Sequence, residues 1–197
     1  MAEAFMFVGI IIMIIGVILL GIMVAYYVLY SLSLYNMAKK YDIPTPGLAW
    51  VPYASYWTLG SIADKIMLRG GKKTRSALIL VIGHGVYFAV SLVLSFAASF
   101  LMAPIMMVGS ETSIIILTVS IYFVLWAMAI ALYVFAYIAY YRIYKDYTDS
   151  APGWLVLSIF VPFAIPFIFF SMAKKQSRSE QFVSYSAPQD DNSFYNQ

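Results

Sequence analysis

The chain has 197 residues, of which 63% are hydrophobic and 11% are charged, and its mean hydropathy is +0.84. Soluble domains carry about 25% charged residues, so this composition excludes a water-soluble globular protein. The formal net charge is only +3, and the absence of cysteine excludes disulfides, thiolate metal sites and cysteine nucleophiles.

Three long apolar runs, at residues 5–36, 77–108 and 113–141, predict membrane-spanning helices. About 20 residues cross the hydrocarbon core as a helix, and a helix satisfies its own backbone hydrogen bonds. Glu3 and the absence of a basic residue before the first run are unlike a cleavable signal peptide, so we expect this helix to be retained. No strand-like alternation is seen, and the expected fold class is an all-α integral membrane protein.

Two shorter apolar segments, 47–63 and 153–173, each follow a Pro-Gly pair and contain a central Val-Pro. A proline inside a helix removes a hydrogen-bond donor and clashes with the preceding turn. We therefore expect these segments to be re-entrant or interfacial and not straight spanning helices. The prolines and glycines concerned are Pro46, Gly47, Pro52, Pro152, Gly153 and Pro162.

The basic residues favour the same topology. If only the three long runs cross the membrane, all 12 Lys and Arg residues lie on one side; if both short segments also cross, they divide between the two sides. The positive-inside rule favours the first arrangement. We expect the amino terminus outside and both Pro-broken segments and the carboxy terminus in the cytoplasm.

An internal repeat relates the two halves at an offset of about 106 positions. The identical pairs include Tyr27/Tyr133, Lys39/Lys145, Pro46/Pro152, Gly47/Gly153 and, after a short insertion, Pro52/Pro162 and Lys65/Lys175. Chance explains matches between apolar residues, but not the aligned Tyr, Lys and Pro positions. The repeats are parallel, a plan also found in some transporters.

The predicted organisation has four parts. Residues 1–65 form the first repeat, 66–112 a basic loop and linking helix, 113–175 the second repeat, and 176–197 a polar tail that we expect to be disordered in the cytoplasm.

The pattern of a basic residue, a polar turn, Pro-Gly near a Trp, a central Pro and a closing Ala-x-Lys covers about residues 35–65 and 141–175. It resembles small Firmicutes-type membrane proteins of families of unknown function. That resemblance implies a bacterial cytoplasmic (inner) membrane protein and supplies no catalytic residues. Trp50 and Trp154 do not stand at equivalent positions in the two copies, which departs from a strict motif.

Polar and aromatic side chains within the spanning runs are candidates for a cleft. His84, the only histidine, is either a proton relay or ligand or a residue of a polar helix interface. Tyr133 and Tyr137 share a helical face with Tyr140, Tyr141 and Tyr144. We expect the last three to form an aromatic belt at the headgroups, and the first two, with Tyr27 and His84, to line a cleft between the repeats.

Two other sets of residues have simpler interpretations. Ser91, Ser95 and Ser99 recur every fourth residue, which is typical of close helix packing and less so of a ligand path. The basic cluster comprises Lys65, Arg69, Lys72, Lys73 and Arg75. It either only fixes topology or also attracts anionic lipid headgroups.

No nucleophile–base pair, paired carboxylates or metal motif is present, and we expect no cofactor, metal or nucleic acid. Asp42, Asp64, Asp146 and Asp149 are interpreted as solvated turn residues. The favoured hypothesis is a non-enzymatic inner-membrane protein that offers a cytoplasmic-side platform to a partner protein or lipid headgroups. The alternatives are an oligomeric transporter or channel subunit with a Tyr-lined cleft, and a membrane-embedded enzyme of lipid metabolism.

Overall fold

The computed structural model describes residues 2–108 and 111–178, and within them the chain forms helices joined by turns, with no strand. The elements are α1 (Ala2–Lys40), η1 (Pro46–Trp50), α2 (Ser55–Arg69), α3 (Ser76–Val108), α4 (Glu111–Tyr147), α5 (Ala151–Phe160), η2 (Pro162–Ala164) and α6 (Ile165–Ala173). The all-α class is confirmed. The tail predicted to be disordered lies, from residue 179 on, outside the described residues.

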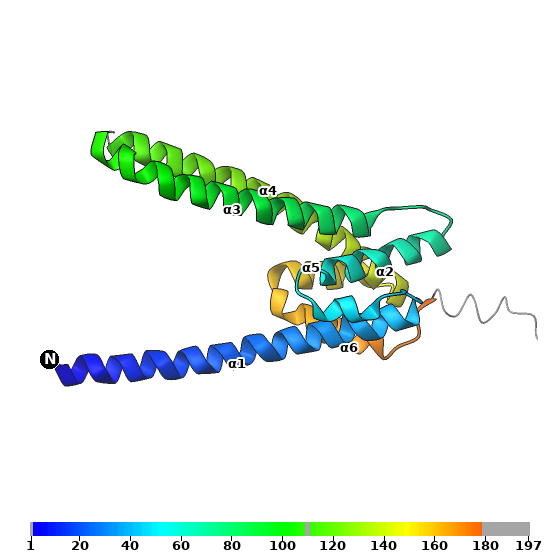
Figure 1. The fold of residues 1–197 in the computed structure, drawn as a ribbon. Helices are drawn as coiled ribbons and strands as arrows, with labels where there is room; N and C mark the ends of the chain where they lie inside the picture. Colours follow the sequence, from blue (N-terminus) through cyan, green and yellow to red (C-terminus); the bar gives the residue numbers. More distant parts are fainter. Residues whose placement is uncertain (1, 109–110, 179–197) are drawn as a thin grey trace, which may run out of the picture.

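Three helices are long and apolar enough to cross a membrane, as the sequence predicted. The stretches are Gly9–Lys40 in α1, Ser76–Phe100 in α3 and Ile115–Tyr147 in α4. Figure 1 shows the three long helices extending to one side and the short helices gathered at the other. In α1 every side chain from residue 9 to 25 is exposed, so this apolar half is suited to contact lipid.

The hydrophobic core lies at the short-helix end of the molecule. There α6 packs against α1, α2 packs against both α3 and α4, and α5 packs against α4. The fully buried side chains include Leu34 and Met37 of α1, Tyr144 of α4 and Phe169 of α6. The rings of Tyr144 and Phe169 lie 5.7 Å apart, centroid to centroid. The long helices are thus held together from one end.

Both predicted Val-Pro breaks interrupt the helical path. η1 ends at Trp50 before α2 begins at Ser55, and α5 ends before Val161, which is followed by η2. Pro162 therefore begins η2, where its missing N–H costs nothing, and Pro52 stands in the turn between η1 and α2.

The two breaks lie beside the same level of α1. The hydroxyl of Tyr27 donates to the carbonyl oxygen of Trp50, and that of Tyr26 donates to the carbonyl oxygen of Pro162 at 3.2 Å. From Tyr26 to the end of α1 at Lys40 is about 21 Å of helix. Each break therefore lies beside α1 at about this distance from the end of the helix.

Two turns that follow helices use a left-handed residue. After α1, Asp42 has φ 51° and the amide of Ile43 donates to the carbonyl oxygen of Ala38. After α2, Gly71 has φ 76° and the amide of Lys72 donates to the carbonyl oxygen of Met67. Both are Schellman-type ends, which satisfy carbonyls that a helix leaves open. Glycine adopts this conformation without strain, whereas Asp is one of the few other residues that tolerate it.

The structure corrects the interpretation of two carboxylates as solvated. Asp146 is 9% exposed and accepts a hydrogen bond of 2.6 Å from the hydroxyl of Tyr41, whose pKa is raised by burial and by the neighbouring Tyr147 and Asp146. Asp64 accepts hydrogen bonds from the start of α3. Asp42 and Asp149 are exposed as expected, and Asp149 pairs with Arg178.

Candidate functional site

An aromatic cavity of about 390 Å³ lies between α2, α3 and α4, where the short helices meet the long ones. Its walls include Tyr53 from the turn before α2, Tyr56 from α2, His84 and Tyr87 from α3, and Tyr133 from α4. Two residues predicted to share a cleft, His84 and Tyr133, are therefore brought together.

His84 is held in a defined orientation. Its Nδ1 lies 2.8 Å from the carbonyl oxygen of Leu80, and its ring stacks on Tyr56 with centroids 3.6 Å apart and planes 18° apart. Because a carbonyl can only accept, Nδ1 donates, and in the neutral ring Nε2 is the remaining acceptor. Burial raises the pKa of Tyr56, so its hydroxyl stays neutral and can donate.

The other two predicted cleft residues lie elsewhere. Tyr27 bonds to the carbonyl of Trp50 in η1, and the hydroxyl of Tyr137 donates to the carbonyl of Ser158 in α5 at 3.2 Å. Both hydroxyls tie a spanning helix to a Pro-broken segment.

The aromatic-belt interpretation is wrong for Tyr140 and Tyr144. These rings are only 8% and 0% exposed, and their hydroxyls bond to Tyr30 and to the Ser158 hydroxyl. They belong to the core because α1, α5 and α6 close around this face of α4.

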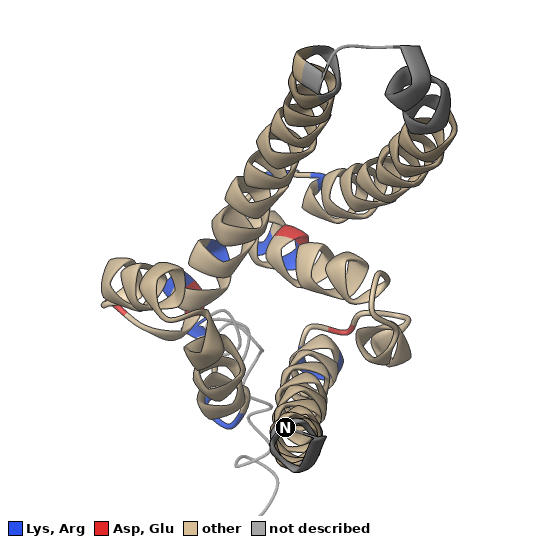
Figure 2. Ribbon diagram, turned by 90° about the vertical axis from the view of Figure 1, so that its left-hand side faces the viewer, with Lys and Arg blue, Asp and Glu red and all other residues tan. Residues whose placement is uncertain are grey.

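The basic cluster is divided between a helix and a loop. Lys65 and Arg69 lie on the last turns of α2, which extends beyond the predicted end at residue 63, and Arg69 lies over the ring of Tyr41 at 5.1 Å. Lys72, Lys73 and Arg75 are exposed in the link between α2 and α3. Figure 2 shows Lys and Arg on the short-helix part and on the adjoining helix ends.

The predicted serine stripe lies on α3. Ser91 and Ser99 donate to carbonyls of their own helix, those of Phe88 and Ser95, so these hydroxyls are satisfied locally. Ser95 lines a small cavity between α3 and α4.

Chemically, the aromatic cavity offers hydroxyls, ring faces and one imidazole. None of the side chains named in its walls is a carboxylate, and among the described residues no three His, Asp or Glu side chains are close enough to hold a metal ion. Such a lining can bind an uncharged amphiphile or, through the ring faces, a cation.

We compared the chain with family models, curated proteins and solved structures, and none of them matches it. The resemblance to Firmicutes-type membrane proteins therefore stays a prediction. The site has to be interpreted from its own geometry.

Sequence reasoning missed Tyr53, Tyr56 and Tyr87 as cavity residues. Tyr56 lies on the first turn of α2, and Tyr53 lies in the turn just before it. That this part of the chain meets α3 and α4 is a tertiary contact, for which the sequence carries no periodic signal.

Proposed function

We propose that this chain is a non-enzymatic, multi-pass protein of the bacterial cytoplasmic membrane whose short-helix end is a cytoplasmic-side platform for anionic lipid headgroups. The observation that supports it is the distribution of charge. All 12 Lys and Arg residues lie at the short-helix end, against four aspartates there among residues 2–108 and 111–178. Two of those aspartates, Asp64 and Asp146, accept internal hydrogen bonds.

Part of this positive charge is exposed on the link between α2 and α3, at Lys72, Lys73 and Arg75. Arg178, at the end of the described residues, pairs with Asp149. Exposed basic residues next to spanning helices attract anionic headgroups by about 1 kcal/mol each. Their placement on one side also supports the orientation with the amino terminus outside.

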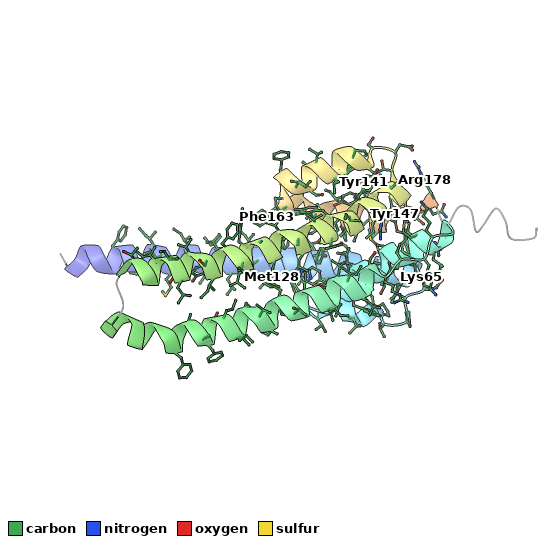
Figure 3. All side chains as sticks on the ribbon, turned by 90° about the horizontal axis from the view of Figure 1, so that it is seen from above. Lys65, Met128, Tyr141, Tyr147, Phe163 and Arg178 are labelled. Carbon is green, nitrogen blue, oxygen red and sulfur yellow. The ribbon has the colours of Figure 1, made fainter. Side chains whose placement is uncertain are left out.

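The depth of the platform follows from helix lengths. From Glu111 to Arg142, α4 extends about 46 Å, close to the 40–45 Å of a bilayer with its headgroups. Arg142 then lies at the cytoplasmic headgroups, and the Val-Pro breaks lie near the hydrocarbon boundary. In Figure 3, Phe163 lies on the side of the long helices' free ends and Lys65 and Arg178 at the opposite end, which agrees with shallow re-entrant segments.

The parallel repeat is part of the proposal. In each half a spanning helix is followed by a proline-broken segment, and the second helix of each segment packs across the molecule. α6 packs on α1, and α2 packs on α4 as well as on α3 and, less extensively, on α1. This exchange of partners is what two parallel units interlocked around a common axis would produce.

A transporter or channel subunit is the second candidate, supported by the cavity that holds His84 and Tyr133. The two functions differ in what they require. A headgroup platform depends on exposed Lys and Arg, whereas a transport path depends on the cavity walls.

The test of the platform is retention of anionic lipid. The protein is reconstituted in mixed phosphatidylcholine and phosphatidylglycerol, extracted in mild detergent, and its retained lipids are counted by mass spectrometry. We expect phosphatidylglycerol to be enriched, and the double variant Lys72→Gln/Lys73→Gln to lose about 1 kcal/mol, or about fivefold in affinity, per charge removed. The enrichment should also fall as salt rises.

The cavity variant Tyr133→Phe serves as the control, because its ring is kept and no charge is changed. Equal retention of the two lipids at low salt would refute the platform. Loss of the phosphatidylglycerol enrichment with Tyr133→Phe alone would refute it in favour of the cavity.

A further inference from the structure

A second cavity, of about 290 Å³, lies between the start of α3 and the last third of α4. Arg75 and Arg142 both line it, together with Thr74 and Ser76. Arg142 stands 66 or more positions after the other three in sequence, and only Arg75 belongs to the basic cluster. No carboxylate of the described part of the chain forms an ion pair with either guanidinium.

The remaining walls are apolar and are formed by Ile79, Leu80, Phe135 and Ile138. Ile79, Phe135 and Ile138 are 41–47% exposed, so they form an open surface and not a closed core. Along α3 the apolar residues follow Arg75 by about 6 Å, and along α4 they precede Arg142 by up to about 10 Å. On both helices the direction from arginine to apolar wall is the direction into the bilayer. The cavity is thus graded from charged to apolar along the membrane normal.

We propose that this cavity is a specific site for one anionic phospholipid, whose phosphate is held by Arg75 and Arg142 and whose acyl chain lies along Ile79 and Ile138. The inference rests on the proposed function and names one discrete site within the platform.

The N–H donors of the two arginines are suited to bind a phosphate group. The Nη1 of Arg142 donates to the hydroxyl of Ser76 at 2.5 Å, which fixes the guanidinium at the cavity and leaves its other N–H donors for an anion. Planar guanidinium groups bind phosphate oxygens in pairs. Basic pockets between spanning helices on the cytoplasmic side are where lipid phosphates bind.

The helix terminus itself contributes little to this site. Asp64 already accepts the amide hydrogens of Ser76 and Ala77, at 2.7 and 3.0 Å, and the hydroxyl of Thr74 at 2.6 Å. The amides at the start of α3 are therefore occupied by an internal anion. The external phosphate has to be bound by the two arginines, which together exceed the charge of this one carboxylate.

The experiment measures phosphatidylglycerol binding to the full-length protein by titration in nanodiscs or by native mass spectrometry. We expect one lipid per chain to bind saturably, in excess of the weaker, unsaturated remainder. Arg142→Gln and Arg75→Gln should each weaken that one lipid at least tenfold, whereas the matched control Lys145→Gln, which lies close to Arg142 in sequence but outside the cavity, should leave it within about twofold. Arg142→Lys should weaken it to an intermediate degree, because it keeps the charge and loses the paired donors.

The other results would overturn the site. If Arg142→Gln and Lys145→Gln weaken binding equally while phosphatidylglycerol is still enriched, the platform stands and the discrete site fails. If there is no enrichment in the native protein, the platform itself fails. A free anion is expected to bind with an affinity on the order of 10 mM. Competition by inorganic phosphate or glycerol phosphate in that concentration range would assign the cavity to a soluble phosphate. Thermal unfolding of each variant without added lipid separates these results from misfolding, and Arg142→Lys covers the case in which Arg142→Gln does not fold.

Discussion

Asp64→Ala is expected to lower the free energy of unfolding by about 2–4 kcal/mol. The carboxylate accepts hydrogen bonds from the Ser76 and Ala77 amides and the Thr74 hydroxyl, and in its absence these donors at the start of α3 are left without their acceptor. The carboxylate also places a negative charge at the positive end of α3, which the truncation removes. The measurement is thermal unfolding in detergent, where a chain of this size should lose about 4–16 °C in Tm.

Asp149→Asn is the matched control for Asp64→Ala. Its side chain is 91% exposed and pairs with Arg178 at the surface, so the free energy of unfolding should change by less than about 0.5 kcal/mol. Equal losses for the two variants would contradict the capping role. An intermediate loss for Asp64→Asn is expected, because the amide oxygen can still accept one of the bonds.

Gly60→Ala is expected to cost about 3 kcal/mol or more, since it separates α2 from α3. A Cβ at position 60 would lie 2.4 Å from the Cα and 2.5 Å from the backbone nitrogen of Ala77. Backbone atoms cannot rotate away as a side chain can, so the two helices have to move apart. The same movement would open the Tyr56–His84 stack and enlarge the aromatic cavity.

Gly85→Ala is the control for Gly60→Ala, because it adds the same methyl group at a position on α3 with open space. A Cβ there meets nothing within 4 Å, so the substitution should stabilise α3 by up to about 1 kcal/mol through helix propensity. Unfolding in detergent compares the two variants. A Gly60→Ala protein with the stability of the native protein and an unchanged aromatic cavity would mean that α2 and α3 are not in this close contact.

The helical architecture could be predicted from the sequence because lipid imposes a strong rule. Apolar runs of sufficient length with no charge, such as that in α1, have one stable structure in a bilayer. The two Val-Pro breaks were also predicted, since proline acts locally on the backbone. The actual helix ends differ from the prediction by several residues: α4 continues to Tyr147 and α2 to Arg69.

The candidate sites were less predictable because they depend on tertiary contacts. The sequence predicts Asp64 to be a solvated residue beside Lys65, yet its carboxylate accepts hydrogen bonds from a helix that begins 12 positions later. Tyr144 reads as part of a headgroup belt, yet it is buried because α5 covers it and offers it the hydroxyl of Ser158. In both cases the residue type allows two environments, and only the packing of distant segments selects between them.

Arg142 illustrates the same limit for function. Its sequence position, at the end of a spanning helix, is explained fully by the positive-inside rule. Its place in a cavity with Arg75 follows from the pairing of α3 with α4.

The central claim is that three helices cross the membrane and that both Pro-broken segments start and end on one side. The chain has no cysteine, so single cysteines can be introduced at Asp42, Leu68, Thr148 and Thr112 and labelled from outside with a membrane-impermeant maleimide in intact cells. We expect Asp42→Cys, Leu68→Cys and Thr148→Cys all to be protected until the membrane is opened, and Thr112→Cys to be labelled directly. Labelling of positions 42 and 68 from opposite sides would contradict the account, because the first Pro-broken segment would then cross the membrane.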